Sequence, residues 1–166
     1  MKDQTCCFTG HRDIPASEYA AINHRLDAEI ENLIHQGVRY FGAGGALGFD
    51  TMAAFAVVRM KIKYPHIRLI LVLPCKNQTR GWEKVNKKIY NIILREADKV
   101  VYLSKRYSYG CMQKRNRHLV EGSAVCICYL TEPKGGTAYT VQYAEKKGLQ
   151  VIHIAPPPAH IPPPPP

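Results

Sequence analysis

Short apolar runs alternate with longer amphipathic segments through most of the chain. The runs are rich in Val, Ile, Leu and Cys and end at glycine, proline or polar residues, which is typical of strands covered on both faces of a parallel sheet. We expect strands at residues 5–8, 38–41, 67–73, 99–103, 124–130 and 150–154.

The segments between these runs place apolar residues three or four positions apart, which indicates amphipathic helices. In the first segment Ser17 is the expected N-cap and Gly37 ends the helix. Strands that alternate with helices build βαβ units with right-handed crossovers. The predicted fold class is therefore α/β, a Rossmann-like three-layer fold with a mostly parallel sheet. The other helices are expected at 49–63, 82–97, from 112 onward and at 137–147.

The length of 166 residues fits a single domain, which we expect to span residues 1–154. Residues 155–166 read APPPAHIPPPPP and hold eight of the twelve prolines. Because so many prolines rule out a helix or a central strand, we expect an extended polyproline II tail. The tail is either inert or a ligand for a groove on a partner.

The composition excludes several classes of protein. No apolar stretch approaches the length of a membrane span, and the polar residues 1–4 are unlike a signal peptide. We therefore expect a cytoplasmic protein without membrane insertion. The six cysteines lack the spacing of metal ligands, and we expect them to be reduced, with no metal and no cofactor. A homodimer is left open.

The formal net charge is +10, and much of it lies between residues 76 and 117, a segment with 12 Lys and Arg residues but three acidic residues. Such a concentration of positive charge suits a nucleic-acid surface, a funnel for an anionic small ligand, or a solvated face. All three interpretations stay open, because no nucleic-acid motif accompanies the charge.

Residues 42–48, GAGGALG, form a glycine-rich turn between the second strand and the following helix. Glycine permits positive φ and close approach of a ligand, and free amides at a helix N-terminus attract anions. We therefore expect this turn to hold a phosphate. Its spacing is neither G-x-G-x-x-G nor G-x-x-x-x-G-K-[ST], so an ordinary NAD enzyme or P-loop NTPase is not supported. The expected ligand-binding glycines are Gly42, Gly44, Gly45 and Gly48.

Further candidates are expected at the same edge of the sheet, because the carboxyl ends of parallel strands meet there. Asp50, just after the turn, is either an N-cap or an acceptor for a sugar hydroxyl. His11 is either a base or a structural residue. The other candidate ligand-binding residues are Thr9, Gly10, Arg12, Arg115, Asn116, Gly135, Gly136 and Thr137.

Four stretches of the chain, taken in order, form a specific combination. They read FTGHR, FGAGGALGFDTMAA, CMQKRNRHLV and KGGTAYTVQYA, and together they resemble the YpsA/YoqJ-like proteins of the SLOG superfamily. That superfamily also contains the DNA-processing protein DprA and the Lonely Guy (LOG) phosphoribohydrolases. The resemblance implies a Rossmann-like fold that binds a nucleotide-like small molecule, in a regulatory role linked to cell division or envelope stress.

The same resemblance bears on catalysis. Residues 112–116 are similar to the M-x-x-R-K stretch of the Lonely Guy enzymes, which puts Arg115 at the position of a catalytic arginine. The glutamate of their P-G-G-x-G-T-x-x-E motif falls on Gln142, whose amide cannot ionise or take a proton. Asp50 or Glu121 would have to replace it. The resemblance thus implies a binding protein first, an N-glycosidase on nucleoside monophosphates second, and DprA-like nucleic-acid binding third.

Overall fold

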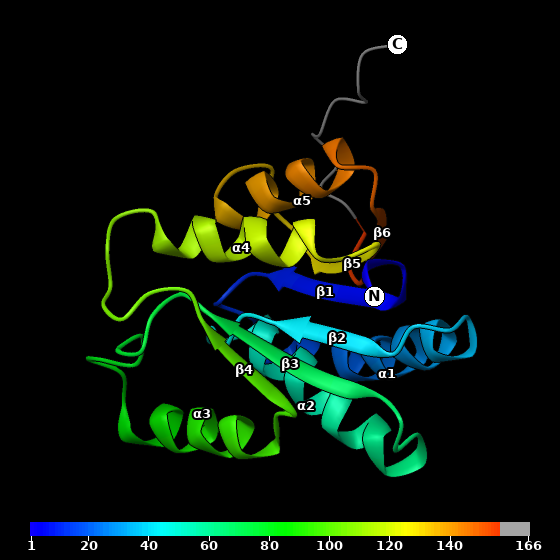
Figure 1. Ribbon diagram of the computed structural model, residues 1–166, viewed down its shortest axis with the longest axis horizontal. Helices are drawn as coiled ribbons and strands as arrows, with labels where there is room; N and C mark the ends of the chain where they lie inside the picture. The colour runs from blue at the N-terminus through cyan, green and yellow to red at the C-terminus, as the bar shows by residue number, and fades with distance from the viewer. Residues whose placement is uncertain (157–166) are drawn as a thin grey trace.

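Each apolar run of the sequence becomes one strand of a six-stranded sheet in a computed structural model, which describes residues 1–156 (Figure 1). All neighbouring strands are parallel, in the order β4-β3-β2-β1-β5-β6, which confirms the predicted α/β class. The predicted polyproline tail lies outside the described residues from position 157 onward. The strands are β1 (Thr5–Gly10), β2 (Tyr40–Ala43), β3 (Arg68–Leu73), β4 (Lys99–Tyr102), β5 (Val125–Tyr129) and β6 (Gln150–His153).

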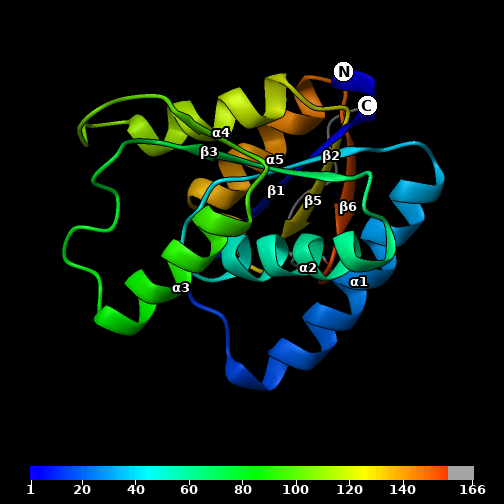
Figure 2. The same cartoon turned by 60° about the horizontal axis from the view of Figure 1, so that its bottom comes forward.

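Helices cover both faces of the sheet and complete three layers. The chain steps from β1 to β4 in one direction and then returns across the sheet to β5, so crossovers of one hand leave helices first on one face and then on the other. Figure 1 shows α4 and α5 above the strands, and Figure 2 shows the other three helices side by side in front of the sheet. The helices are α1 (Tyr19–His35), α2 (Phe49–Lys63), α3 (Lys84–Glu96), α4 (Cys111–Glu121) and α5 (Gly136–Lys146).

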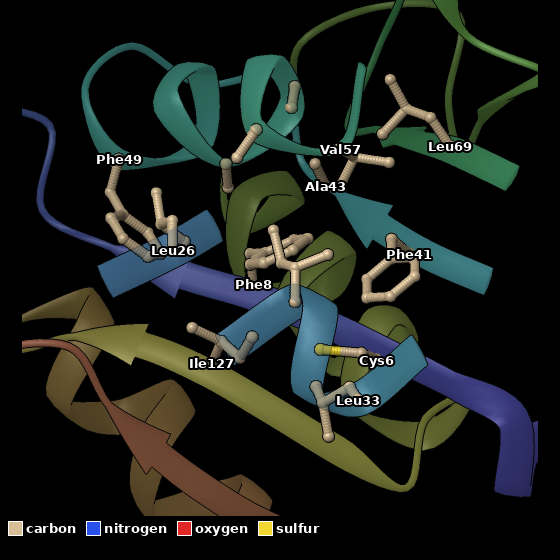
Figure 3. Close-up of a cluster of buried hydrophobic side chains, with 14 of the residues drawn as sticks. Cys6, Phe8, Leu26, Leu33, Phe41, Ala43, Phe49, Val57, Leu69 and Ile127 are labelled. Atoms are coloured by element: carbon tan, nitrogen blue, oxygen red, sulfur yellow. The ribbon is translucent and has the colours of Figure 1, made fainter. Parts of the chain in front are cut away.

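The two faces of the sheet form separate cores because alternate strand residues point to opposite sides. In β1, Cys6 and Phe8 join the core beneath α1 and α2, whereas Cys7 joins the core beneath α4 and α5. Phe8 lies between Phe41 and Phe49, with ring centroids 6.3 and 6.5 Å away (Figure 3). Burying one such side chain contributes about 1.5–3 kcal/mol. All six cysteines lie within the described residues, and each is a buried free thiol, as expected.

The expected N-cap at Ser17 is wrong. Ser17 lies inside a short 3₁₀ helix, Ala16–Glu18, and α1 begins at Tyr19 with Glu18 at its N-cap and no side-chain cap. The Tyr19 N–H already donates to the carbonyl of Ala16. The 3₁₀ turn therefore supplies the backbone partner that a serine hydroxyl would otherwise provide.

The second strand lies two residues later than expected. The Val38 N–H donates to the Leu33 carbonyl at 3.0 Å, so Val38 still belongs to the closing turn of α1, which Gly37 makes with φ +98°. At its other end β2 runs on to Ala43, and Gly42 pairs with strand neighbours on both sides. Gly42 is therefore a strand residue, and the turn proper starts after Ala43.

The strand order places a topological switch point at β1. The chain leaves β1 toward β2, β3 and β4 on one side, while β5 and β6 occupy the other. At such a point the connections diverge above the carboxyl ends of the central strands and leave a crevice in which α/β proteins bind ligands. We therefore expect the loops that follow β1 and β5 to border a ligand-binding crevice.

Close packing at the end of β1 should make Gly10 intolerant of a side chain. A Cβ at Gly10 would lie 2.5 Å from the Phe49 Cβ, and Phe49 is held by its stacking on Tyr129. We expect Gly10→Ala to lower the free energy of unfolding by about 1–3 kcal/mol through overpacking, as measured by urea denaturation. In the control Gly122→Ala the nearest atom would be 3.5 Å away, and the change should stay within about 0.5 kcal/mol. Equal effects of the two substitutions would contradict this packing.

Candidate functional site

A cavity of about 410 Å³ opens at the switch point, where β1 and β5 end. Its size lies within the range of sites for small ligands. Four parts of the chain enclose it: the loop after β1, the glycine-rich turn with the start of α2, the middle of α4, and the loop that leads into α5. The lining residues are Thr9, Gly10, His11, Arg12, Ala46, Asp50, Met112, Arg115, Asn116, Glu132, Lys134, Gly135, Gly136 and Thr137.

The lining contains most of the candidate residues but not the glycines of the turn. Residues from three separate stretches of sequence meet here as expected, together with Asp50. The candidates in the lining are Thr9, Gly10, Arg12, Asp50, Arg115, Asn116, Gly135, Gly136 and Thr137. The candidates outside it are Gly42, Gly44, Gly45 and Gly48.

The glycines of the turn are required by contacts within the protein. A Cβ at Gly44 would lie 2.8 Å from the Arg115 Nε and closer still to the rest of the guanidinium. Gly45 and Gly48 have φ of +72° and +78°, and a Cβ at Gly48 would meet the backbone of Arg12. The turn therefore shapes the cavity by letting other residues approach it closely.

Arg115 is buried at the back of the cavity, with only 3% of its surface exposed. Its Nη1 donates to the Gly44 carbonyl, and its Nε donates to Asn116 Oδ1 at 2.7 Å. Burial lowers the pKa of Arg115, and the field of Asp50 opposes this change. A guanidinium remains protonated in proteins, so Arg115 places a fixed positive charge on the cavity wall.

Asp50 is the buried acid of the cavity, with 6% of its surface exposed. It is not the N-cap of α2, because Gly48 occupies that position. Its carboxylate nevertheless accepts a backbone hydrogen bond, from the Ala46 N–H at 3.3 Å. Burial raises the pKa of the Asp50 carboxyl, while the Arg115 charge and the Ala46 bond act in the opposite direction.

The rim of the cavity carries positive charge and a helix N-terminus. Arg12 is exposed and lies over Trp82, with its guanidinium carbon 6.0 Å from the ring centroid. Lys134 is exposed on the opposite loop. Helix α5 starts there with Gly135 at the N-cap, φ +101°, and no side-chain cap. Gly135, Gly136 and Thr137 thus bring the uncapped start of α5 to the cavity lining, and free amides at a helix N-terminus attract anions.

His11 has a structural role in this arrangement. Its Nε2 accepts a hydrogen bond from the Thr131 N–H at 2.9 Å, and its ring packs edge-on against Tyr129. The bond joins the loop after β1 to the loop after β5, and it requires an unprotonated Nε2. Burial lowers the pKa of His11, although Glu132 opposes this.

Of Asp50 and Glu121, the two residues that could replace the missing glutamate, one lines the cavity and the other does not. Glu121 lies at the end of α4, where it accepts a hydrogen bond from the Tyr143 hydroxyl, and it does not line the cavity. Gln142 is exposed and also lies outside the lining. Of the two proposed replacements, only Asp50 is in place.

Glu132 lines the cavity but was not among the expected site residues, and Met112, the Met of the stretch similar to M-x-x-R-K, lines it as well. Glu132 could have been found, because it lies in the same loop as Gly135 and Gly136. Met112 has an apolar side chain at the start of a helix, so only its place in that stretch, and not its own chemistry, distinguishes it from a packing residue. Within residues 1–156, no cluster of three or more His, Cys, Asp or Glu is suited to a metal ion, and no helix is long and apolar enough to cross a bilayer.

Comparison with known proteins identifies a family and relatives that match most of the chain. The sequence profile described as the YspA SLOG family matches residues 7–154. A UPF0398 protein of Halalkalibacterium halodurans is 33% identical over 132 residues, which cover 78% of this chain and 70% of that protein. The uncharacterised SPbeta prophage-derived protein YoqJ of Bacillus subtilis is 32% identical over 141 residues, which cover 77% of this chain and 82% of YoqJ.

Two solved structures share the fold. DNA processing protein A from Helicobacter pylori, described for its single-stranded DNA binding mode, and DprA from Streptococcus pneumoniae each superpose with a TM-score of 0.66 at 18% identity. The superpositions cover 92% of this chain but 65% and 50% of the two DprA chains. At this identity the likeness establishes the Rossmann-like fold alone.

The His11 bond should make stability depend on pH. The folded pKa of His11 lies below the unfolded value near 6.5, so its contribution is complete above that pH and is lost as the pH falls through the folded pKa. We expect the urea midpoint to drop less between about pH 7.5 and about pH 5 in His11→Gln than in the wild type. Glutamine keeps an acceptor for Thr131 but does not titrate. Parallel curves for the two proteins would contradict this assignment.

Proposed function

The chain belongs to the YspA SLOG family, and we propose that it is a cytoplasmic sensor that binds a nucleotide or nucleotide derivative in the cavity at the ends of β1 and β5. One observation carries the proposal. The cavity at the switch point combines the free N-terminus of α5 with positive charges from three separate loops or helices, those of Arg12, Arg115 and Lys134. The description of one DprA neighbour as binding single-stranded DNA is in keeping with a ligand built from nucleotides.

The rim is suited to the phosphate of such a ligand. Lys134 and Arg12 line the cavity from different loops, and the first turn of α5 adds its amides and the Thr137 hydroxyl to the same lining. No acidic residue lies in the first turn of α5 to occupy those amides. An anion held there gains both charge-assisted hydrogen bonds and the field of the helix.

The interior is suited to the sugar or the base. Asp50 offers carboxylate oxygens, Asn116 an amide and Thr9 a hydroxyl, all on the cavity wall. Such groups pair with hydroxyls and ring nitrogens, whereas an inorganic anion would use only the rim. A ligand with phosphate at one end and hydrogen-bonding groups at the other therefore matches the cavity better than free phosphate.

Removing one rim charge should weaken binding without harming the fold. We expect Lys134→Ala to raise the Kd for AMP by about tenfold or more, since hydrogen bonds to charged groups contribute about 1.5–3 kcal/mol. Isothermal titration calorimetry measures the change. Lys146→Ala is the matched control, because Lys146 lies in the last turn of the same helix and should leave the Kd within about twofold.

The ligand panel for this experiment is AMP, ADP-ribose, NAD and cyclic nucleotides. Binding of at least one of them, lost in Lys134→Ala and kept in Lys146→Ala, supports the site. Folded wild-type protein that binds none of the panel contradicts the proposed function.

Hydrolysis of a nucleoside monophosphate is a second candidate, favoured by the position of Asp50 alone. In that reaction the bond between C1′ and the base nitrogen breaks, a water oxygen bonds to C1′, and the base leaves with a proton. A buried carboxyl whose pKa is raised above its ordinary value is suited to proton transfer at this step. Arg115 would hold the substrate beside it.

Chromatography of adenine released from AMP tests this second function. Asp50→Asn should reduce the release by about 100-fold or more, because an amide cannot take the proton. Gln142→Ala should leave the rate unchanged, since Gln142 is exposed outside the cavity lining. Protein that binds AMP but releases no adenine at high enzyme concentration would exclude hydrolysis and leave the binding function intact.

A further inference from the structure

A second cavity, of about 510 Å³, lies at the same edge of the sheet but away from the switch point. It is enclosed by the loop after β3 and the loop after β4, so it shares no lining residue with the first cavity. Its lining residues are Asn77, Gln78, Arg80, Arg106 and Tyr107.

Tyr107 presents an aromatic ring on a fixed backbone. Its ring is largely open to solvent, since the residue is 64% exposed. Its N–H donates to Asn77 Oδ1 at 2.9 Å, and the Ser104 hydroxyl donates to the Arg106 carbonyl at 3.0 Å. Both bonds hold the loop in place, so the ring is a preformed surface for stacking rather than part of a core.

Arg80 and Arg106 bring positive charge that no carboxylate neutralises. Every ion pair found within residues 1–156 uses a cation from residues 1–63. Both arginines are exposed, and Lys76 lies nearby, with its Nζ 5.7 Å from the centre of the Tyr102 ring. Unpaired cations beside exposed rings favour a ligand that has both phosphates and planar groups.

Gln78 lines this cavity with an amide group that is fixed by the protein. Its Nε2 donates to the Gly45 carbonyl at 2.7 Å, which fixes the orientation of the amide. Its Oε1 is then buried without a hydrogen-bond partner among the described residues. Gln78 therefore forms a fixed polar part of the wall that joins this cavity to the glycine-rich turn.

We propose that this second cavity binds one nucleotide unit of a single-stranded nucleic acid. The base stacks on Tyr107, the adjoining phosphates lie against Arg80 and Arg106, and the strand continues over the basic surface around them. A duplex does not fit this chemistry, because its bases are already stacked. An acidic peptide would satisfy the arginines but would leave the Tyr107 ring unused.

Fluorescence anisotropy with a labelled oligothymidylate tests the role of the ring. We expect Tyr107→Ala to raise the Kd at least about fivefold, which is the low end of the effect of losing one stacked base. Tyr107→Phe keeps the ring and should restore binding. Tyr109→Ala is the control, because Tyr109 is fully exposed two residues away and does not line the cavity. Thermal unfolding of each variant checks that it is folded.

The arginines are tested through the salt dependence of the same binding. Arg80→Ala combined with Arg106→Ala should lower the slope of log Kd against log salt by about 1–2. The pair Lys146→Ala and Lys147→Ala removes equal charge from the far end of α5 and should leave the slope unchanged.

Several outcomes would overturn the proposal. The first is that oligothymidylate does not bind at low salt. The second is that the Tyr107→Ala variant binds oligothymidylate as tightly as the wild type does. The third is that a DNA duplex or polyglutamate binds as tightly as the single-stranded oligomer. If thymidine monophosphate binds as tightly as the oligomer, the cavity is a site for free nucleotides, and the proposed binding of a single-stranded nucleic acid is refuted. AMP titrations of Tyr107→Ala should match the wild type, so a failure here is distinguishable from a failure of the first cavity.

Discussion

The burial of the Arg115 guanidinium is the constraint on which this edge of the sheet depends. Arg115 comes from α4 on one face of the sheet, while its countercharge, Asp50, comes from α2 on the other. Its carbonyl partner, Gly44, lies between them at the end of β2. Stripping a buried charge of its partner costs about 3–5 kcal/mol, so these three elements must meet in one arrangement.

The glycine-rich turn satisfies this constraint residue by residue. The Gly44 carbonyl accepts from Arg115, the Gly45 carbonyl from Gln78, and the Ala46 amide donates to Asp50. Three consecutive residues thus bind α4, the loop after β3, and α2. Arg115 lines one cavity and Gln78 lines the other, so the turn holds a lining residue of each proposed site.

Ion pairs are found on α1 and α2 but not in the loops at the carboxyl edge of the sheet, within the described residues. Lys and Arg residues on α1 and α2 are neutralised by neighbouring carboxylates, as in the pairs of Arg59 with Asp27 and Lys63 with Glu31. The loops at the carboxyl edge have no such pairs in the described part of the chain. Cations in these loops, among them Arg12, Arg80 and Arg106, would steer anionic ligands toward both cavities.

The sequence by itself determined the layers of the fold and the set of loops that meet at one edge. Alternating periods of apolar residues dictate strands and helices locally, and parallel strands bring loops such as those of Thr9, Arg115 and Thr137 together. Only the tertiary structure decided which way the groups face. Gly44 carries its carbonyl toward a buried arginine rather than toward open space, and Gln142 points outside the cavity that Asp50 enters. Those directions arise from contacts between residues far apart in the chain, and local periodicity contains no information about them.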